Sequence, residues 1–214
     1  MNQNGVDTSL IETRDMPGGH TVIQVSREAQ NAILLFGGSN GAVDEAYADR
    51  VLAQFGAGDI LLLQNEISAL PYILEKAHAR GMEIWLNPSP MNENVLKCNL
   101  SLVSVFVLNE VEGAILDKLL QKYPHAAAVL TLGSKGAWYA KEDKRAFAPA
   151  ELVRAVDTTA AGDTFTGYFM RGMLDGLSPK KSLILAAKAA AIAVSRPGAA
   201  PSIPLYAEVM SERN

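Results

Sequence analysis

The sequence is short of cysteine, histidine and long hydrophobic runs. Its 214 residues contain one cysteine, Cys98, and three histidines that lie far apart. A disulfide framework within the chain is therefore impossible, and a cysteine-rich zinc module is excluded. No apolar run reaches the roughly 18 residues of a membrane-spanning helix. The first residues lack the basic and apolar segments of a secretory signal, so a cytoplasmic protein that does not engage a membrane is expected.

Basic residues are also slightly fewer than acidic residues. The chain has 19 lysines and arginines against 23 aspartates and glutamates, which gives a formal net charge of −4 at pH 7. A protein that binds nucleic acid by neutralising phosphates is usually basic, so no nucleic-acid partner is expected. Hydrophobic residues make up 49% of the chain. This proportion supplies enough apolar surface for one large folded domain or two small ones.

What the chain does contain is a regular alternation of strand and helix patterns. Short apolar runs predict strands at residues 21–25, 32–36, 59–63, 83–86, 104–108 and 127–132. Helical patterns occur at residues 44–55 and 70–80, in a segment ending near residue 122, and at residues 161–175 and 179–195. This order predicts an α/β fold with a doubly wound, mostly parallel sheet of the Rossmann type between two layers of helices. The first two strands are expected to form a small hairpin, and residues 136–147 to add short antiparallel strands.

Three further segments carry structural expectations only. Residues 152–156 are expected to form another strand, and Trp85 and Trp138 to lie in the core. The alanines of residues 186–193 allow the last long helix to pack closely, so they need no functional role.

The most informative stretch is DTTAAGD at residues 157–163. Small residues that lead into a helix leave backbone N–H groups uncovered, and the helix start adds partial positive charge, so this segment suits a phosphoryl group. Asp163 would lie in the first helical turn beside that anion, where a carboxylate can take a proton from an attacking hydroxyl. The same residues also fit an ordinary turn, since acids favour the first turn of a helix.

This stretch closely resembles the C-terminal signature of the ribokinase-like (PfkB-type) sugar kinases. Six other segments resemble motifs of that family in the same order: GGSN at residues 37–40, LLLQNE at 61–66, NPSP at 87–90, NEVE at 109–112, TLGSKG at 131–136 and RPGAAPS at 196–202. The resemblance implies a ribokinase-like fold whose hairpin forms a lid. It also implies transfer of the γ-phosphoryl group of ATP to a sugar hydroxymethyl group, with ribose as the expected acceptor.

The resemblance assigns roles to individual positions. Asp163 matches the catalytic base and contacts the sugar, and the N–H groups of Ala161, Gly162 and Asp163 match the anion hole. Asn109 and Glu112 match the pair that organises Mg²⁺ through water and the phosphates. Taken locally, Asn109 is also a good helix N-cap and Glu112 its capping-box partner. Glu66 matches an acid that binds the sugar, although it also fits a solvated acid after a strand.

Two larger sets follow from the same resemblance. The ATP-binding positions are Asn109, Thr131, Leu132, Gly133, Ser134, Lys135, Gly136 and Gly162. The positions of a K⁺ site are Asp157, Thr159, Ala193, Arg196, Gly198 and Ser202. Oxygen-only ligands of this kind suit a hard cation.

The chain departs from the family at its beginning. The family's substrate-binding aspartate and its Gly-Gly motif near the sugar are missing, so the N-terminal third is expected to be absent. The resemblance divides the remainder into a partial lid at residues 1–40, where a homodimer could form, and a nucleotide-binding α/β kinase core at residues 41–214. Three alternatives stay open: an active kinase, a catalytically impaired nucleotide-binding remnant, or a partner subunit. The acceptor could also be a ketohexose, an aldonate or a nucleoside.

Overall fold

The computed structural model describes residues 1, 4–25 and 31–211. Its strands are β1 (His20–Val25), β2 (Asn31–Phe36), β3 (Ile60–Gln64), β4 (Glu83–Asn87), β5 (Val105–Leu108), β6 (Ala127–Thr131), β7 (Ala137–Lys141) and β8 (Lys144–Ala148). Its α-helices are α1 (Glu45–Leu52), α2 (Leu70–Ala79), α3 (Glu93–Leu96), α4 (Leu116–Lys122), α5 (Ala161–Leu174), α6 (Pro179–Val194) and α7 (Tyr206–Met210).

The strands confirm the predicted fold class. β1 and β2 form the expected antiparallel hairpin, and the others form one sheet in the order β3-β4-β5-β6-β7-β8. β4, β5 and β6 run parallel, whereas β7 and β8 are antiparallel. The turn expected between the hairpin strands lies outside the described residues.

The chain divides into two compact units. The first comprises residues 1–84 and 88–102, and the second residues 85–87 and 103–214. In the first unit, Asp44 caps the start of α1, because the N–H of Tyr47 donates to Asp44 Oδ1 over 2.7 Å. The core of this unit includes Leu74, Ile84 and Val95, each fully buried.

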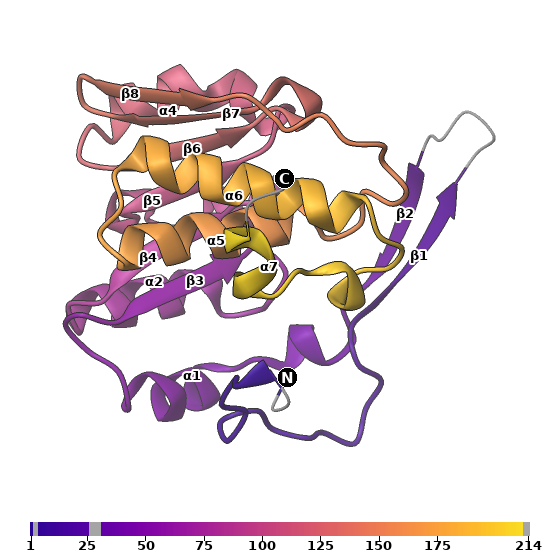
Figure 1. The fold of residues 1–214 in the computed structure, drawn as a ribbon. Helices are drawn as coiled ribbons and strands as arrows, with labels where there is room; N and C mark the ends of the chain where they lie inside the picture. Colours follow the sequence, from indigo (N-terminus) through magenta and orange to yellow (C-terminus); the bar gives the residue numbers. More distant parts are fainter. Residues whose placement is uncertain (2–3, 26–30, 212–214) are drawn as a thin grey trace. The chain divides into compact units, whose positions relative to one another are not determined.

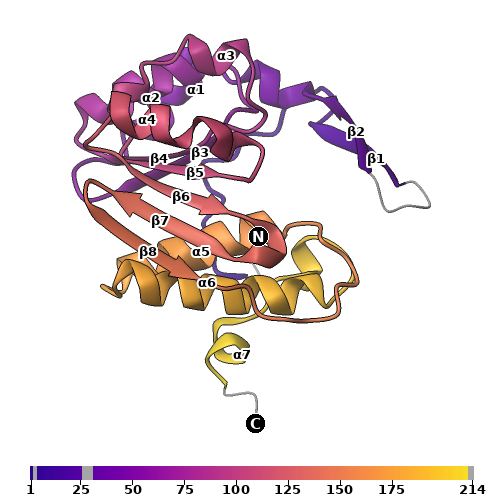
Figure 2. The same ribbon diagram turned by 90° about the horizontal axis from the view of Figure 1, so that it is seen from above.

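The second unit holds the parallel strands and the two long helices. Helices α5 and α6 lie side by side on one face of β5–β8, and α4 covers the other face (Figures 1 and 2). Phe169 of α5 is at the centre of the core, with the rings of Trp85, Tyr139 and Phe165 between 5.9 and 6.4 Å away. This aromatic cluster fixes α5 against the sheet, and with it the segment that precedes α5.

Two expectations about this unit are wrong. Residues 152–156 form no strand, and Leu152 and Val156 are 95% and 62% exposed. Trp85 is buried as expected, but Trp138 is 41% exposed and packs its ring on Phe147, 4.8 Å between centroids.

Candidate active site

The start of α5 has the properties of an anion-binding site. Its N-cap residue, Ala160, adopts the left-handed conformation (φ 59°, ψ 10°) and has no side chain that could cap the helix. The first four N–H groups of an α-helix have no acceptor within the helix, and the helix dipole makes this end positive. The N–H of Ala161 makes a long 3.3 Å hydrogen bond to Thr158 O. The chain thus presents this helix start to a ligand instead of capping it with its own side chain.

Asp163 lies in the first turn of α5, exposed, at the edge of a cavity of about 170 Å³. The cavity lies where the parallel strands β4, β5 and β6 end, and such crevices are where open α/β sheets bind ligands. Its lining comprises Asn87, Val107, Leu108, Asn109, Thr131, Thr158, Ala160, Ala161, Gly162, Asp163 and Thr166. The structure therefore brings the expected base, the expected anion hole and Asn109 to one place.

Asn109 and Glu112 interlock at the end of β5. The N–H of Asn109 donates to Glu112 Oε2 over 3.1 Å, and the N–H of Glu112 donates to Asn109 Oδ1 over 3.0 Å. This reciprocal pair is a capping box, as the local pattern suggested. It fixes both side chains, and Glu112 is buried beneath the surface while Asn109 faces the cavity.

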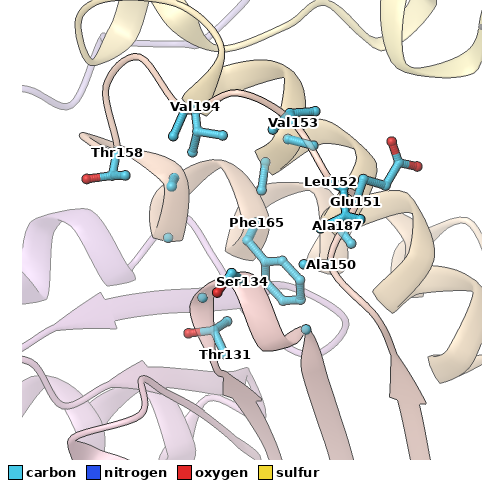
Figure 3. A pocket seen from close by; sticks show the side chains of 17 residues that line it. Thr131, Ser134, Ala150, Glu151, Leu152, Val153, Thr158, Phe165, Ala187 and Val194 are labelled. Carbon is cyan, nitrogen blue, oxygen red and sulfur yellow. The ribbon is translucent and has the colours of Figure 1, made fainter.

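A second, larger cavity of about 340 Å³ continues from the first. The two share Thr131, Thr158, Ala161 and Gly162. From there the larger cavity extends past Phe165 to the segment that includes Leu152 and to Ala187 of α6 (Figure 3). Its volume falls in the range of small-molecule sites. Besides the four shared residues, its lining comprises Gly133, Ser134, Gly136, Ala150, Glu151, Leu152, Val153, Ala155, Phe165, Ala187, Ala190, Ala191 and Val194.

The loop after β6 forms one wall of this cavity. Thr131 Oγ1 donates to Leu108 O over 3.2 Å, and the N–H of Leu132 donates to Gly136 O over 2.9 Å. Among the expected ATP-binding positions here, Thr131, Gly133, Ser134 and Gly136 line the cavity. Leu132 and Lys135 line neither cavity; the Lys135 ammonium instead pairs with Glu110, 2.5 Å away.

The residues expected to hold K⁺ come from two segments that meet beside the start of α5. Asp157 Oδ1 accepts from the N–H of Thr159 and Oδ2 from the N–H of Gly198, both over 2.9 Å. Hydrogen bonds from Thr159, through its side chain and backbone, and from Gly198 lower the pKa of Asp157. The Val194 carbonyl accepts from the N–H groups of Val156 and Asp157. These bonds hold the segment before α5 against the end of α6 and the segment that follows it.

The other residues expected to hold K⁺ lie in α6 and in the segment that follows it. Ala193 and Ser202 are buried, and Ser202 Oγ donates to Ala199 O over 2.7 Å. The Arg196 side chain is not directed at this loop, because its guanidinium pairs with Glu208 of α7 over 2.6 Å. Its contribution to a cation site would therefore be its backbone carbonyl.

Glu66, the expected sugar-binding acid, belongs to the first unit and follows β3 directly. Its side chain is exposed. The preceding residue, Asn65, is buried; its carboxamide donates to Asn92 Oδ1 over 3.0 Å and to Pro90 O over 2.5 Å. These bonds fix the backbone that carries Glu66.

Several cavity residues escaped the sequence analysis. Asn87 ends β4 and lines the smaller cavity, yet only its motif was noted. Ala187, Ala190 and Ala191 line the larger cavity, although the alanines of α6 were expected to serve packing alone. The spacing of these alanines, which places them on one face of the helix, could have indicated that this face leaves space beside it.

Within the described residues, no group of three or more His, Cys, Asp or Glu side chains is placed to hold a metal ion. In the same part of the chain, none of the helices is both long and apolar enough to cross a bilayer.

The fold and these joined cavities define an α/β protein with an anion-binding helix start at the carboxyl ends of its strands. The profile described as pfkB family carbohydrate kinase matches residues 1–205, and the chain belongs to this family. Its fold is accordingly ribokinase-like.

Individual relatives support the assignment. The ribokinase of Schizosaccharomyces pombe is 37% identical over 89% of the chain, and that of Haemophilus influenzae 34% identical over 97%. The structure of Arabidopsis thaliana ribokinase complexed with ribose and ATP matches with a TM-score of 0.75 at 26% identity, covering 92% of this chain and 69% of that one. The chain spans 66% and 73% of the length of the first two relatives.

Proposed function

We propose that the chain phosphorylates the hydroxymethyl group of a sugar with ATP, and that ribose is the acceptor. One observation carries the proposal: the uncapped start of α5 places Asp163 beside the junction of two cavities. The larger cavity suits a nucleotide, and the smaller one suits the transferred phosphoryl group. Membership of the pfkB family and the ribose and ATP in the Arabidopsis ribokinase support this arrangement.

Each residue has a defined task in this reaction. The sugar hydroxyl oxygen attacks the γ-phosphorus, the bond to the leaving ADP oxygen breaks, and the hydroxyl proton passes to the Asp163 carboxylate. The N–H groups of Ala161, Gly162 and Asp163 stabilise the charge on the transferred group, because they are already oriented in the helix start.

The oxygen ligands present fit the two implied cations. Mg²⁺, when bound, neutralises phosphate charge; Asn109 and Glu112 would hold it through water and the phosphates. For K⁺, the Asp157 and Ser202 side chains and the carbonyls of residues 159, 193, 196 and 198 form an oxygen-only set. The bond from the Gly198 N–H to Asp157 supports this site, because it brings the two segments together. K⁺ should raise both the phosphorylation rate and the unfolding temperature with ADP bound, relative to Na⁺; equal values in both salts would contradict the site.

The test is coupled ADP release by the chain with ATP, Mg²⁺ and K⁺, with and without ribose. Asp163→Asn keeps the shape of the side chain but removes the base, so ribose-dependent release should fall by at least about 100-fold. Thermal stabilisation by ATP should remain. Asp175→Asn, at the other end of α5 in an exposed ion pair with Arg171, is the matched control.

Three outcomes would redirect the proposal. Turnover of Asp163→Asn close to that of the parent would remove Asp163 as the base. Stabilisation by ATP without release would indicate a nucleotide-binding module or a partner subunit. Release with a ketohexose, an aldonate or a nucleoside, but not with ribose, would change the acceptor.

We further propose that two copies associate through the hairpin. The pairs His20–Phe36 and Val22–Leu34 lie on one face of β1 and β2, and the side chains of Val22, Leu34 and Phe36 are at least half exposed. A second copy would remove these apolar side chains from water. Light scattering should find a dimer, and Leu34→Glu should yield a monomer; an unchanged mass would contradict this interface.

A further inference from the structure

The two halves of the larger cavity differ in chemistry. The half shared with the smaller cavity lies at the start of α5, where the phosphates would be bound. The base of a nucleotide would therefore occupy the other half, between α6 and residues 150–153. This assignment rests on the proposed function, in which the larger cavity binds the nucleotide that donates the phosphoryl group.

The α6 wall of the base half has no hydrogen-bonding side chain. Ala187, Ala190, Ala191 and Val194 are spaced three and four residues apart and line the cavity together. Phe165 of α5 presents its ring to the same space (Figure 3). The cavity exists here because alanines leave room that larger side chains would fill.

The opposite wall is apolar and open to water. Ala150, Leu152 and Val153 have apolar side chains, and Leu152 is 95% exposed although it borders the cavity. Glu151 contributes the one charged side chain among the residues that line the cavity in the described part of the chain, and it is exposed at the rim. The polar edge of a bound base can therefore stay hydrated along this wall.

The hydroxyl groups of the remaining wall do not distinguish one purine from another. Thr131 Oγ1 already donates to Leu108 O. The Ser134 hydroxyl can rotate to donate or to accept, so it suits the amino group of adenine and the carbonyl group of guanine equally.

We infer that the site selects its phosphate donor by the size and flatness of a purine and accepts ATP, ITP and GTP alike. Sites that hydrogen-bond a substrate group discriminate by about 10⁴–10⁵-fold, whereas apolar pockets discriminate by only about 10–200-fold. The kcat/KM values for ITP and GTP should therefore lie within about 100-fold of the value for ATP. CTP should be a poorer donor than any purine, because its single ring buries less apolar surface.

The experiment measures kcat/KM for ATP, ITP, GTP and CTP with ribose in excess Mg²⁺. Thermal stabilisation by ADP, IDP and GDP provides a second reading that does not require turnover. Similar values for the three purines in both measurements are expected. A preference for adenine above about 1,000-fold in either one would overturn the inference. If no nucleotide is turned over but the three diphosphates stabilise the chain equally, the proposed function fails, and the inference stands for the binding of purine nucleotides.

Two variants test which residues could distinguish GTP from ATP. Glu151→Gln should leave the ratio of GTP to ATP unchanged; a shift of tenfold or more would make this carboxylate a base reader. Ala187→Asn adds a donor and an acceptor to the apolar wall, so it should change the ratio. Ile184→Asn, on the exposed side of α6, is the matched control and should not. If both asparagine variants left the ratio unaltered, α6 would not be the base wall.

Discussion

A methyl group added at Gly136 would collide with backbone atoms, so Gly136→Ala should destabilise the fold. Its backbone conformation (φ 108°, ψ −152°) is one that almost only glycine adopts. A Cβ atom there would lie 2.3 Å from Ala148 O, 2.9 Å from Pro149 Cα and 3.1 Å from Ala150 N. All three atoms belong to the backbone, so the segment after β8 would have to move.

Gly133 in the same loop is the matched control. It also has a positive φ of 54°, but a Cβ atom there would meet nothing within 4 Å. Gly133→Ala should therefore cost only the left-handed conformation, about 1 kcal/mol. Gly136→Ala adds backbone overlap to a more restricted conformation, for a total of about 4 kcal/mol.

Thermal unfolding followed by circular dichroism separates the two variants. For a chain of this length the melting temperature should fall by roughly 2–4 °C for Gly133→Ala and about 8–16 °C for Gly136→Ala. Nucleotide binding should weaken further in Gly136→Ala, because the displaced segment includes Ala150 of the larger cavity. Equal shifts for the two variants would refute the reasoning that the close approach of residues 148–150 requires glycine at this position.

Three other perturbations test the second unit and the lone thiol. The hydrogen bond from Arg196 lowers the pKa of Glu208. The stability that this carboxylate contributes is therefore present above its unfolded pKa, and it is lost as the pH falls below 4.5 through the folded pKa. The melting temperatures of the parent and Glu208→Gln should differ at pH 7 and converge in acid, and a difference that stays constant with pH would contradict this. Burial raises the pKa of Cys98, so iodoacetamide should alkylate it at pH 8 more slowly in the folded chain than in urea, and equal rates would argue against burial. Gly172→Ala would place a Cβ atom 2.7 Å from a side-chain oxygen of α6 and should destabilise by about 1–3 kcal/mol; Gly167→Ala, with nothing within 4 Å, should not lower the stability.

The parts of the fold that follow from the sequence are those fixed by neighbouring residues. The Asp44 cap and the capping box of Asn109 and Glu112 both involve groups within three positions of one another. Short apolar runs also identified the buried strands, because both faces of a parallel sheet are covered. The motif at residues 157–163 indicated the helix start because small residues and a first-turn acid are local features as well.

The parts that failed depend on distant partners. Residues 152–156 have a strand-like pattern, but a strand forms only where a sheet edge is available, and here the segment forms the rim of the larger cavity. The small side chains of α6 were visible in the sequence, whereas the space beside Ala187 and Ala190 is not. Fully buried Ala186 and Ala189 serve packing, and their neighbours line the cavity. Only the position of the facing segments distinguishes these two roles.

The closure between Asp157 and Gly198 has a consequence for the order of folding. Residues 157–198 form one continuous segment, and its ends are joined by bonds from the Gly198 N–H to Asp157 and from the Val156 N–H to Val194 O. Contacts at the turn between α5 and α6, such as the bond from the Leu177 N–H to Gly172 O, join residues near in sequence and carry little loop-closure entropy. The bond from Gly198 to Asp157, in contrast, spans 41 positions, more than the 22 that separate Val105 of β5 from its partner Ala127 of β6. We therefore expect the turn between α5 and α6 to form early, and the helix start that receives the phosphates to be completed only when the segments at residues 157 and 198 meet.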